Sequence, residues 1–211
     1  MEKDTNLKEM VYNAVLQEII SGKYQSGDIL NEKKLIEQYQ VSKSPVRDAL
    51  IALCADDVIR SIPRYGYEVI RLTHRDIYEM LQYREFLESN ILKAGYQRIG
   101  GKEIEVLRAL NKNCQRDDVN PIQHWRYNMD FHVKLMEFCG NSFITMNVRR
   151  CMSRLLRAYS QLYWNERVDR LLSYDTKHHE LIIADLVRRD PEALANDIRE
   201  DLHDFGGFTG F

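Results

Sequence analysis

The stretch Leu30–Val69 constrains the fold most, because it contains two short helical segments, a tight polar turn between them and a hairpin after them. The second segment opens with the sequence SKSPVR at residues 42–47. Ser42 or Ser44 can cap it, because a hydroxyl accepts a bond from a free N–H of the first turn. Pro45 is tolerated there, since those N–H groups lack helical partners. Apolar residues recur at helical spacing, with Leu35, Ile36 and Tyr39 in the first segment and Val46, Leu50 and Leu53 in the second.

This order of segments is the layout of a helix-turn-helix, whose second helix is the recognition helix. When the apolar side chains of that helix face inward, Lys43, Ser44 and Arg47 point outward from its start. The run Arg60–Val69 follows, and it predicts a hairpin with Gly66 in the turn and β-formers on the return strand. A hairpin directly after a recognition helix is a wing.

The segment Ser42–Leu50, SKSPVRDAL, is similar to the signature of the GntR regulators, whose usual form is S-R-x-P-V-R-E-A-L. Landmarks within residues 20–35 and the spacing Pro63-x-x-Gly66 fit the same family in register, so the resemblance spans about residues 7–70. It implies a winged domain that binds double-stranded DNA.

Two residues depart from the family pattern: Lys43 stands where Arg is usual, and Asp57 where Gly is usual. Lys43 and Arg47 can donate to guanine O6 and N7, but Lys lacks the planar fork of Arg, so we expect a softer base preference at that position. Asp adopts the left-handed conformation at a helix end less readily than Gly. The expected DNA-binding residues are Lys33, Ser42, Lys43, Ser44, Arg47, Arg64, Tyr65 and Gly66.

The formal net charge of the 211-residue chain is −2, so no overall basicity indicates a nucleic-acid partner. A local field can still bind DNA. We expect one side of the winged domain to gather Lys33, Lys34, Lys43, Arg47, Arg60 and Arg64.

The start of the chain and its cysteines favour a cytoplasmic protein. The first residues, MEKDTN, are polar and do not resemble a signal peptide, and no apolar run approaches the ~20 residues of a membrane span. The four cysteines show no C-x-x-C spacing, which favours reduced core residues over disulfides or metal ligands.

After a boundary near Arg71, Thr73 and Asp76 form a capping-box pattern, and no strand pattern follows. We therefore predict a mainly α fold, with a winged helix-turn-helix domain at 1–71 and a helical bundle at 72–211. The tail 205–211 is rich in Gly and Phe, and its role stays open. The predicted helices of the bundle are 73–99, 102–116, 121–139, 142–164, 173–189 and 191–205.

Four polar residues lie on apolar helix stripes of the bundle: Asn128, His132, His179 and Asp201. His179 is preferred over its neighbour His178, because its spacing matches the apolar residues that follow. Buried polar groups are costly unless satisfied, so the four together suggest a divalent zinc, nickel or manganese site. The alternative is that each histidine bonds a backbone carbonyl or a water in the core.

This bundle looks like the FCD ligand-binding domain that follows the winged domain in the FadR-like GntR subfamily. The resemblance covers about residues 73–203. Metal-binding members place Asp four residues before the first His, and a His in each of the last two long helices. Carried over, these positions are Asn128, His132, His179 and Asp201, so Asn128 replaces an Asp and Asp201 a His.

Arg84 and Glu88 share a helix face with Ile77 and Leu81. A guanidinium that faces a bundle cavity suits a carboxylate ligand. The alternative is an internal Arg84–Glu88 pair one turn apart. Family members carry Arg and Glu at this spacing, and the resemblance therefore implies that both lie near an effector pocket.

Together these patterns predict a homodimeric regulator that binds an inverted-repeat operator and is controlled by a small organic acid. The resemblance implies that it is a repressor. A metal-responsive regulator is an alternative. A metalloenzyme, with Glu88 beside the metal, is a further one, but it leaves the winged domain unexplained.

Overall fold

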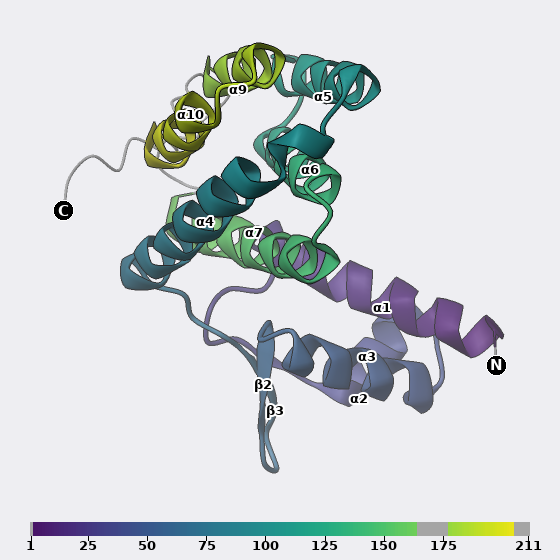
Figure 1. Ribbon diagram of the computed structural model, residues 1–211. Coiled ribbons are helices and arrows are strands. Elements are labelled where there is room, and N and C mark those ends of the chain that lie inside the picture. The colour runs from purple at the N-terminus through teal and green to yellow at the C-terminus, as the bar shows by residue number, and fades with distance from the viewer. Residues whose placement is uncertain (1, 164–176, 205–211) are drawn as a thin grey trace. The chain divides into compact units, whose positions relative to one another are not determined.

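The structure is a computed structural model that describes residues 2–163 and 177–204, and the chain divides into two compact units (Figure 1). The first contains the chain up to His74 together with Arg157–Leu162, and the second contains Arg75–Leu156 and the residues from Tyr163 onward. The predicted fold class is confirmed, since a winged helix-turn-helix precedes an all-helical part.

The first unit consists of helices and a three-stranded sheet around one apolar core. Helix α1 buries Val11, Val15 and Ile19, and the second and third helices add Leu35 and Leu50 to the same cluster. The elements are α1 (Glu2–Ile20), β1 (Ile29–Leu30), α2 (Glu32–Tyr39), α3 (Lys43–Ala55), β2 (Ile59–Ile62) and β3 (Gly66–Val69).

Helix α3 begins where the sequence predicts, but its cap differs from the prediction. Ser42 occupies the N-cap position and makes no side-chain capping bond, and the Ser44 hydroxyl donates to Asp48 over 3.3 Å. Pro45 explains this, because it stands three residues after Ser42, where a capping serine often finds its N–H, and proline has none. In α2, by contrast, Asn31 accepts from two backbone N–H groups of the first turn.

The predicted wing is the hairpin β2–β3, with Arg60 paired to Glu68 in register and Gly66 at the start of the return strand (Figure 1). Strand β1 pairs with β3 and was not predicted, because two residues are too few to show alternation. A Cβ on Gly66 would lie 2.5 Å from the Leu30 carbonyl oxygen, so this third strand also requires glycine there. Asp57 has a left-handed φ of 52°, at the position where the family usually has Gly.

The end of helix α7 (Ser142–Tyr163) belongs to the first unit. Arg157 Nη1 donates to the Asp57 carbonyl over 2.8 Å. The Gln161 amide donates to the Ile70 carbonyl and accepts from the Leu72 N–H, each over 3.0 Å. Three backbone groups of the segment 57–72 are therefore satisfied by α7 side chains.

The second unit is helical throughout its described residues, as predicted. The predicted first helix ends early, at Gly95, and continues as the 3₁₀ turn Tyr96–Arg98. The predicted break near 165–170 and the tail 205–211 lie outside the described residues. The helices besides α7 are α4 (His74–Gly95), α5 (Gly101–Cys114), α6 (Pro121–Phe138), α9 (Lys177–Arg188) and α10 (Pro191–Asp204).

Within the described part of the chain, no helix combines the length and apolar character of a membrane span. No disulfide joins the four cysteines, and Cys114 and Cys139 are buried as expected.

Gly95, at the end of α4, lies against Cys139, the residue that caps the end of α6. A Cβ on Gly95 would lie 2.7 Å from the Cys139 Cβ, and seven residues earlier in each chain segment Glu88 meets His132. Glycine is required at 95 because a neighbouring backbone occupies the space of a side chain.

We expect Gly95→Ala to destabilise the helical unit by about 1–3 kcal/mol, because the added methyl group overpacks against Cys139. Chemical denaturation followed by circular dichroism measures this loss. Gly101→Ala is the control, since nothing lies within 4 Å of a Cβ there. Equal stability of the two variants would contradict the close contact of Gly95 with Cys139.

Candidate nucleic-acid interface and metal centre

A groove of about 570 Å³ lies between α2, the start of α3 and the wing. Five of the predicted DNA-binding residues line it, and Asn31, Glu32, Ser61 and Tyr67 also contribute. The predicted residues in the groove are Lys33, Lys43, Arg64, Tyr65 and Gly66.

The three remaining predicted residues, Ser42, Ser44 and Arg47, are exposed at the start of α3 and do not line this groove. Arg47 follows Lys43 by one helical turn, so the two cations share a face. The wing tip presents Tyr65 with 71% of its surface exposed. One exposed surface therefore combines a helix N-terminus with a hairpin, and phosphates bind at helix N-termini.

Sequence reasoning missed Glu32, whose carboxylate lies 3.6 Å from the Lys43 ammonium. Glu32 is the first residue of α2, where a negative charge also favours the helix dipole. An acidic residue directly after an N-cap was the available signal. The ion pair offsets part of the positive charge at the start of α3.

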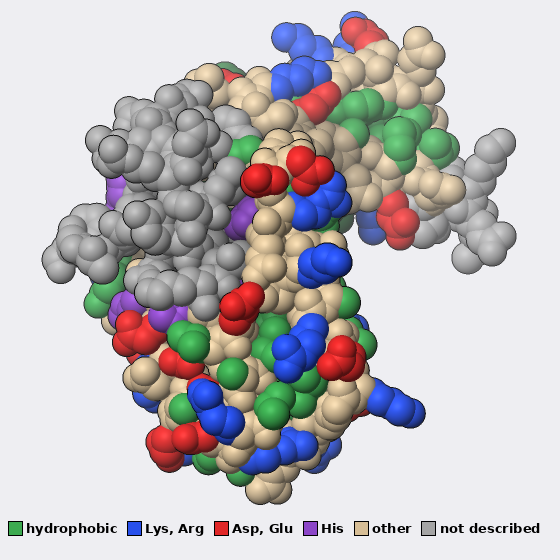
Figure 2. All heavy atoms as spheres, turned by 90° about the horizontal axis from the view of Figure 1, so that it is seen from above, with side chains coloured by type: hydrophobic (Ala, Val, Ile, Leu, Met, Phe, Trp, Pro, Cys, Tyr) green, Lys and Arg blue, Asp and Glu red, His purple; other side chains and the backbone are tan. Residues whose placement is uncertain are grey.

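Acidic and basic side chains are mixed on the face that Figure 2 shows, in keeping with the net charge of −2. Affinity for a phosphate backbone therefore depends on a local cluster of cations rather than on the charge of the whole chain.

The second unit contains a fully buried chain of charged groups. Arg84 Nε donates to Glu88 Oε1 over 2.5 Å, and His132 Nδ1 donates to Glu88 Oε2 over 2.8 Å. All three side chains are at most 1% exposed. Burial disfavours the charge of Glu88, but Arg84 and His132 outweigh it and lower the pKa of Glu88 to about 2. The structure therefore shows the internal Arg84–Glu88 pair that was the alternative, and the effector-binding role of Arg84 stays a prediction.

His132 connects this pair to α10. Its Nε2 lies 3.0 Å from Asp201 Oδ2, and Asp201 is 2% exposed. Burial alone would lower the pKa of His132, but the carboxylates of Glu88 and Asp201 raise it to about 9. Burial likewise opposes the charge of Asp201, while the adjacent His179 and His132 rings lower its pKa below the usual range.

His179 is held from two sides. Its Nδ1 donates to Asn111 Oδ1 over 3.1 Å, and its ring stacks on Phe131 with centroids 3.8 Å apart. Burial lowers the pKa of His179 to about 3, so the ring is neutral and its Nε2 keeps a lone pair. That Nε2 lies 3.4 Å from His132 Nε2.

Two residues of α5 and α9 differ from what the sequence indicated. Asn111 was missed, although it follows Leu107 by four residues on the apolar stripe of α5, which was the signal to read. His178 was expected to face outward and is buried like His179, because α9 packs against both α5 and α10.

Asn128 lies one turn before His132 on α6 and is fully buried. Neither atom of its amide has a hydrogen-bond partner among the described residues, and the same holds for Arg84 Nη1. The structure thus brings all six predicted effector and metal residues into the buried interior of one unit.

Comparisons with known proteins identify both halves of the chain. Residues 7–69 match the family described as bacterial regulatory proteins, gntR family, and residues 79–204 match the FCD domain. The chain belongs to the GntR family of transcriptional regulators, with an FCD domain. The family consists of transcription regulators and not of enzymes, so the metalloenzyme alternative is excluded.

Several relatives of this GntR regulator are known. It is 26% identical to the gluconate operon transcriptional repressor of Bacillus licheniformis, over 90% of this chain and 79% of that one. It is 25% identical to the Nta operon transcriptional regulator of Aminobacter aminovorans, over 83% and 82%. The solved structure of E. coli McbR/YncC has the same fold, with a TM-score of 0.77, 20% identity and 93% coverage of each chain.

FCD domains can bind metals, and His132, His179 and Asp201 fit such an ion. Two nitrogens bound to one tetrahedral zinc at about 2.0–2.1 Å stand about 3.4 Å apart, which is the separation of the two Nε2 atoms. Each ring also donates its Nδ1 proton to an acceptor, Glu88 or Asn111, as metal-bound histidines do. His132 must release its Nε2 proton to bind a cation.

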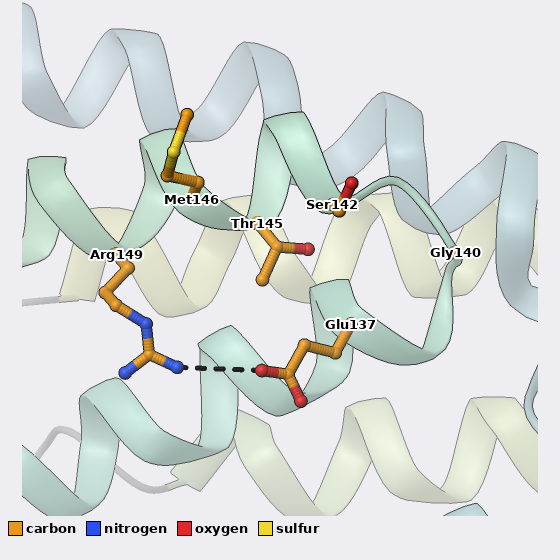
Figure 3. A pocket seen from close by; sticks show the side chains of 6 residues that line it. All are labelled: Glu137, Gly140, Ser142, Thr145, Met146 and Arg149. Atoms are coloured by element: carbon orange, nitrogen blue, oxygen red, sulfur yellow. Dashed lines mark ion pairs between the residues drawn. The ribbon is translucent and has the colours of Figure 1, made fainter.

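A separate pocket of about 450 Å³ lies at the turn between α6 and α7 of the FCD domain (Figure 3). Arg149 on α7 points toward Glu137 on α6, and their charged groups lie 3.6 Å apart. The pocket is open and its cation is paired with a carboxylate. We therefore assign no ligand to it.

We expect Glu88→Gln to cost about 3–5 kcal/mol of unfolding free energy, because it leaves the Arg84 guanidinium buried without a counter-charge. Glu79→Gln is the matched control: it breaks the Arg75–Glu79 pair, which has the same spacing on the same helix but is exposed. Chemical denaturation should show a large loss for the first variant and little change for the second. Similar small losses in both would contradict a buried charge chain.

Proposed function

We propose that this GntR regulator is a repressor that reads its operator with Lys43 and Arg47 and responds to a small carboxylate bound in the FCD domain. The observation that supports the DNA-reading role is the exposed pair of cations on one face of α3, beside a groove that the wing completes. Acting on DNA, the protein would work in the bacterial cytoplasm.

On DNA, the N-terminal residues of a recognition helix contact base edges in the major groove. Arg47 can bind guanine O6 and N7 through two parallel bonds, and Lys43 can donate to the same acceptors as a point charge. Lys33, Ser42, Ser44 and the wing residues Arg64, Tyr65 and Gly66 are better placed for phosphates, which position the protein without specifying a sequence.

The proposed effector site combines a divalent ion with Arg84. His132, His179 and Asp201 would hold zinc, nickel or manganese, and Asn128 would add a neutral oxygen ligand. The ion supplies a positive centre to which a carboxylate binds. Arg84 stands beside this centre, and Glu88 orients both Arg84 and His132.

We further propose a homodimer that reads an inverted repeat, as symmetric dimers do. An effector changes operator affinity only by its differential affinity for the two states of the protein. The names of the gluconate operon relatives, which are repressors, support repression as the sign of control.

A metal-responsive regulator is the second candidate, and the three preassembled ligand atoms favour it. If operator affinity changes with the concentration of free metal ion in the absence of any organic acid, this alternative is supported. Operator affinity that changes only when an acid is added would select the first.

Arg47→Ala should weaken operator binding about 5- to 150-fold, which is the ~1–3 kcal/mol of one bidentate base contact, and leave nonspecific binding nearly unchanged. The operator is selected from random duplexes by the unaltered protein, and affinities are measured by fluorescence anisotropy at fixed salt. Arg75→Ala, which removes an exposed cation at the start of α4, is the charge-matched control. Equal losses on selected and random duplexes would contradict base reading by Arg47.

The purified protein should hold about one divalent ion per chain, and His132→Ala should lose it, because a closed set of ligands loses one of its nitrogens. Mass spectrometry of metals after exhaustive dialysis measures the content. His203→Ala is the control, since that histidine is exposed and 3.4 Å from Glu85. An unaltered protein without a stoichiometric ion would contradict the metal site.

A further inference from the structure

We infer that helix α7 connects the FCD interior to the recognition helix, and that Arg157 is the positioning residue through which ligand occupancy of the FCD domain changes DNA binding. The inference rests on the proposed function, because it needs an operator bound by α3, and it adds the route by which that binding is regulated. Helix α7 belongs to both compact units: its residues up to Leu156 lie in the second unit, and Arg157–Leu162 lie in the first.

The first part of α7 is buried in the FCD interior. Val148 and Met152 are fully buried and belong to the same apolar cluster as Phe131. The Cys151 thiol donates to a backbone carbonyl of α4 over 3.6 Å. Burial raises the pKa of that thiol to about 11, and the positive charge of the nearby Arg84 opposes this only in part. A rearrangement around Arg84 therefore acts directly on a side chain of α7.

The last part of α7 holds the end of the recognition helix. Asp56 is the C-cap residue of α3, and Arg157 donates through Nη2 to its carbonyl over 3.4 Å and through Nη1 to the Asp57 carbonyl over 2.8 Å. Arg157 is only 3% exposed, and the Tyr12 hydroxyl of α1 donates to Asp56 Oδ2 over 2.7 Å. The last carbonyls of a helix lack partners within it, and a cation favours that end. Arg157 therefore completes the C-terminal end of the proposed DNA-reading helix.

A second contact lies one turn further along α7. The Gln161 amide donates to the Ile70 carbonyl and accepts from the Leu72 N–H. Ile70 directly follows β3, the return strand of the wing. Side chains of α7 therefore hold both the end of α3 and the exit of the wing, so a displacement or rotation of α7 moves both elements that the proposed function places on DNA.

Two properties make this connection stiff. An α-helix rises 1.5 Å per residue, so Cys151 and Arg157 are about 9 Å apart along one hydrogen-bonded rod. A buried guanidinium is costly without hydrogen bonds, so Arg157 resists separation from the two carbonyls. If α7 only needed to pack at this point, an apolar side chain would serve without the cost of burying a charge.

Linkage makes this coupling testable without a known effector. If ligand occupancy of the FCD domain changes operator affinity, operator binding must change the FCD interior by the same free energy. The probe is therefore the operator duplex itself, selected from random sequences by the unaltered protein. Amide hydrogen exchange of the full-length chain, measured by mass spectrometry with and without saturating duplex, reports local opening in α4, α6 and the first part of α7.

The inference predicts that operator binding changes exchange rates in these FCD segments by at least about fivefold, the lower end of usual allosteric coupling. Arg157→Gln should lose this change even when all of the protein is bound, and should weaken operator binding about tenfold, the effect of one hydrogen bond to a charged group. Arg157→Lys keeps the charge but not the fork that spans two carbonyls, and should restore part of the change. Arg150→Gln removes an exposed cation from the same helix and is the matched control, which should behave like the unaltered protein.

The outcomes separate this inference from the proposed function. If the protein selects no duplex, both fail. If it binds a selected duplex and exchange in the FCD segments does not change, DNA reading stands and the inference is overturned. An undiminished exchange response in Arg157→Gln overturns the role of Arg157, because a merely structural residue would lower stability and leave the response intact. Should Arg157→Gln not fold, Arg157→Lys decides, and a full response in that variant overturns the role as well.

Discussion

Charges that have no contact with water must be neutralised inside the protein, and this constraint organises the FCD domain. Arg84 and Glu88 on α4, His132 on α6, and Asp201 on α10 form a chain of alternating charge. Isolated buried charges cost several kcal/mol each, so every member depends on its neighbours. Asn111 on α5 and His179 on α9 extend the network through neutral groups. Five helices are therefore held in register by polar contacts as well as by apolar packing.

The elements themselves could be predicted from the sequence to a large degree. Apolar spacing and Gly, Asn and Pro breaks place α5, α6 and α10 within two residues of their observed ends, because such helices follow from local pattern. The two-residue strand β1 could not be predicted, since its pairing with β3 depends on residues far along the chain. The sequence favours the missing hydroxyl bond at Ser42, because Pro45 removes one of the two N–H groups that could donate to it.

The candidate site, too, could be predicted from the sequence only in part. The stripes of α4, α6, α9 and α10 identified Arg84, His132, His179 and Asp201, because a polar residue at an apolar position is visible in one helix alone. The sequence does not show which atoms of these side chains contact one another, since that depends on how the helices pack. The bonds from His132 to Glu88 and from His179 to Asn111 fix which nitrogen of each ring carries the proton, and only the structure reveals them.

The buried pair Arg84–Glu88 limits how the interior of such a protein can change in sequence over time. Any single replacement of one partner leaves the other charge stranded in the interior, so the pair resists stepwise substitution. Asn128 carries no charge and its amide makes no hydrogen bond to a described residue, so exchanges there leave no buried charge without a partner. Sequence change is therefore easier at this neutral position than within the ionic chain beside it.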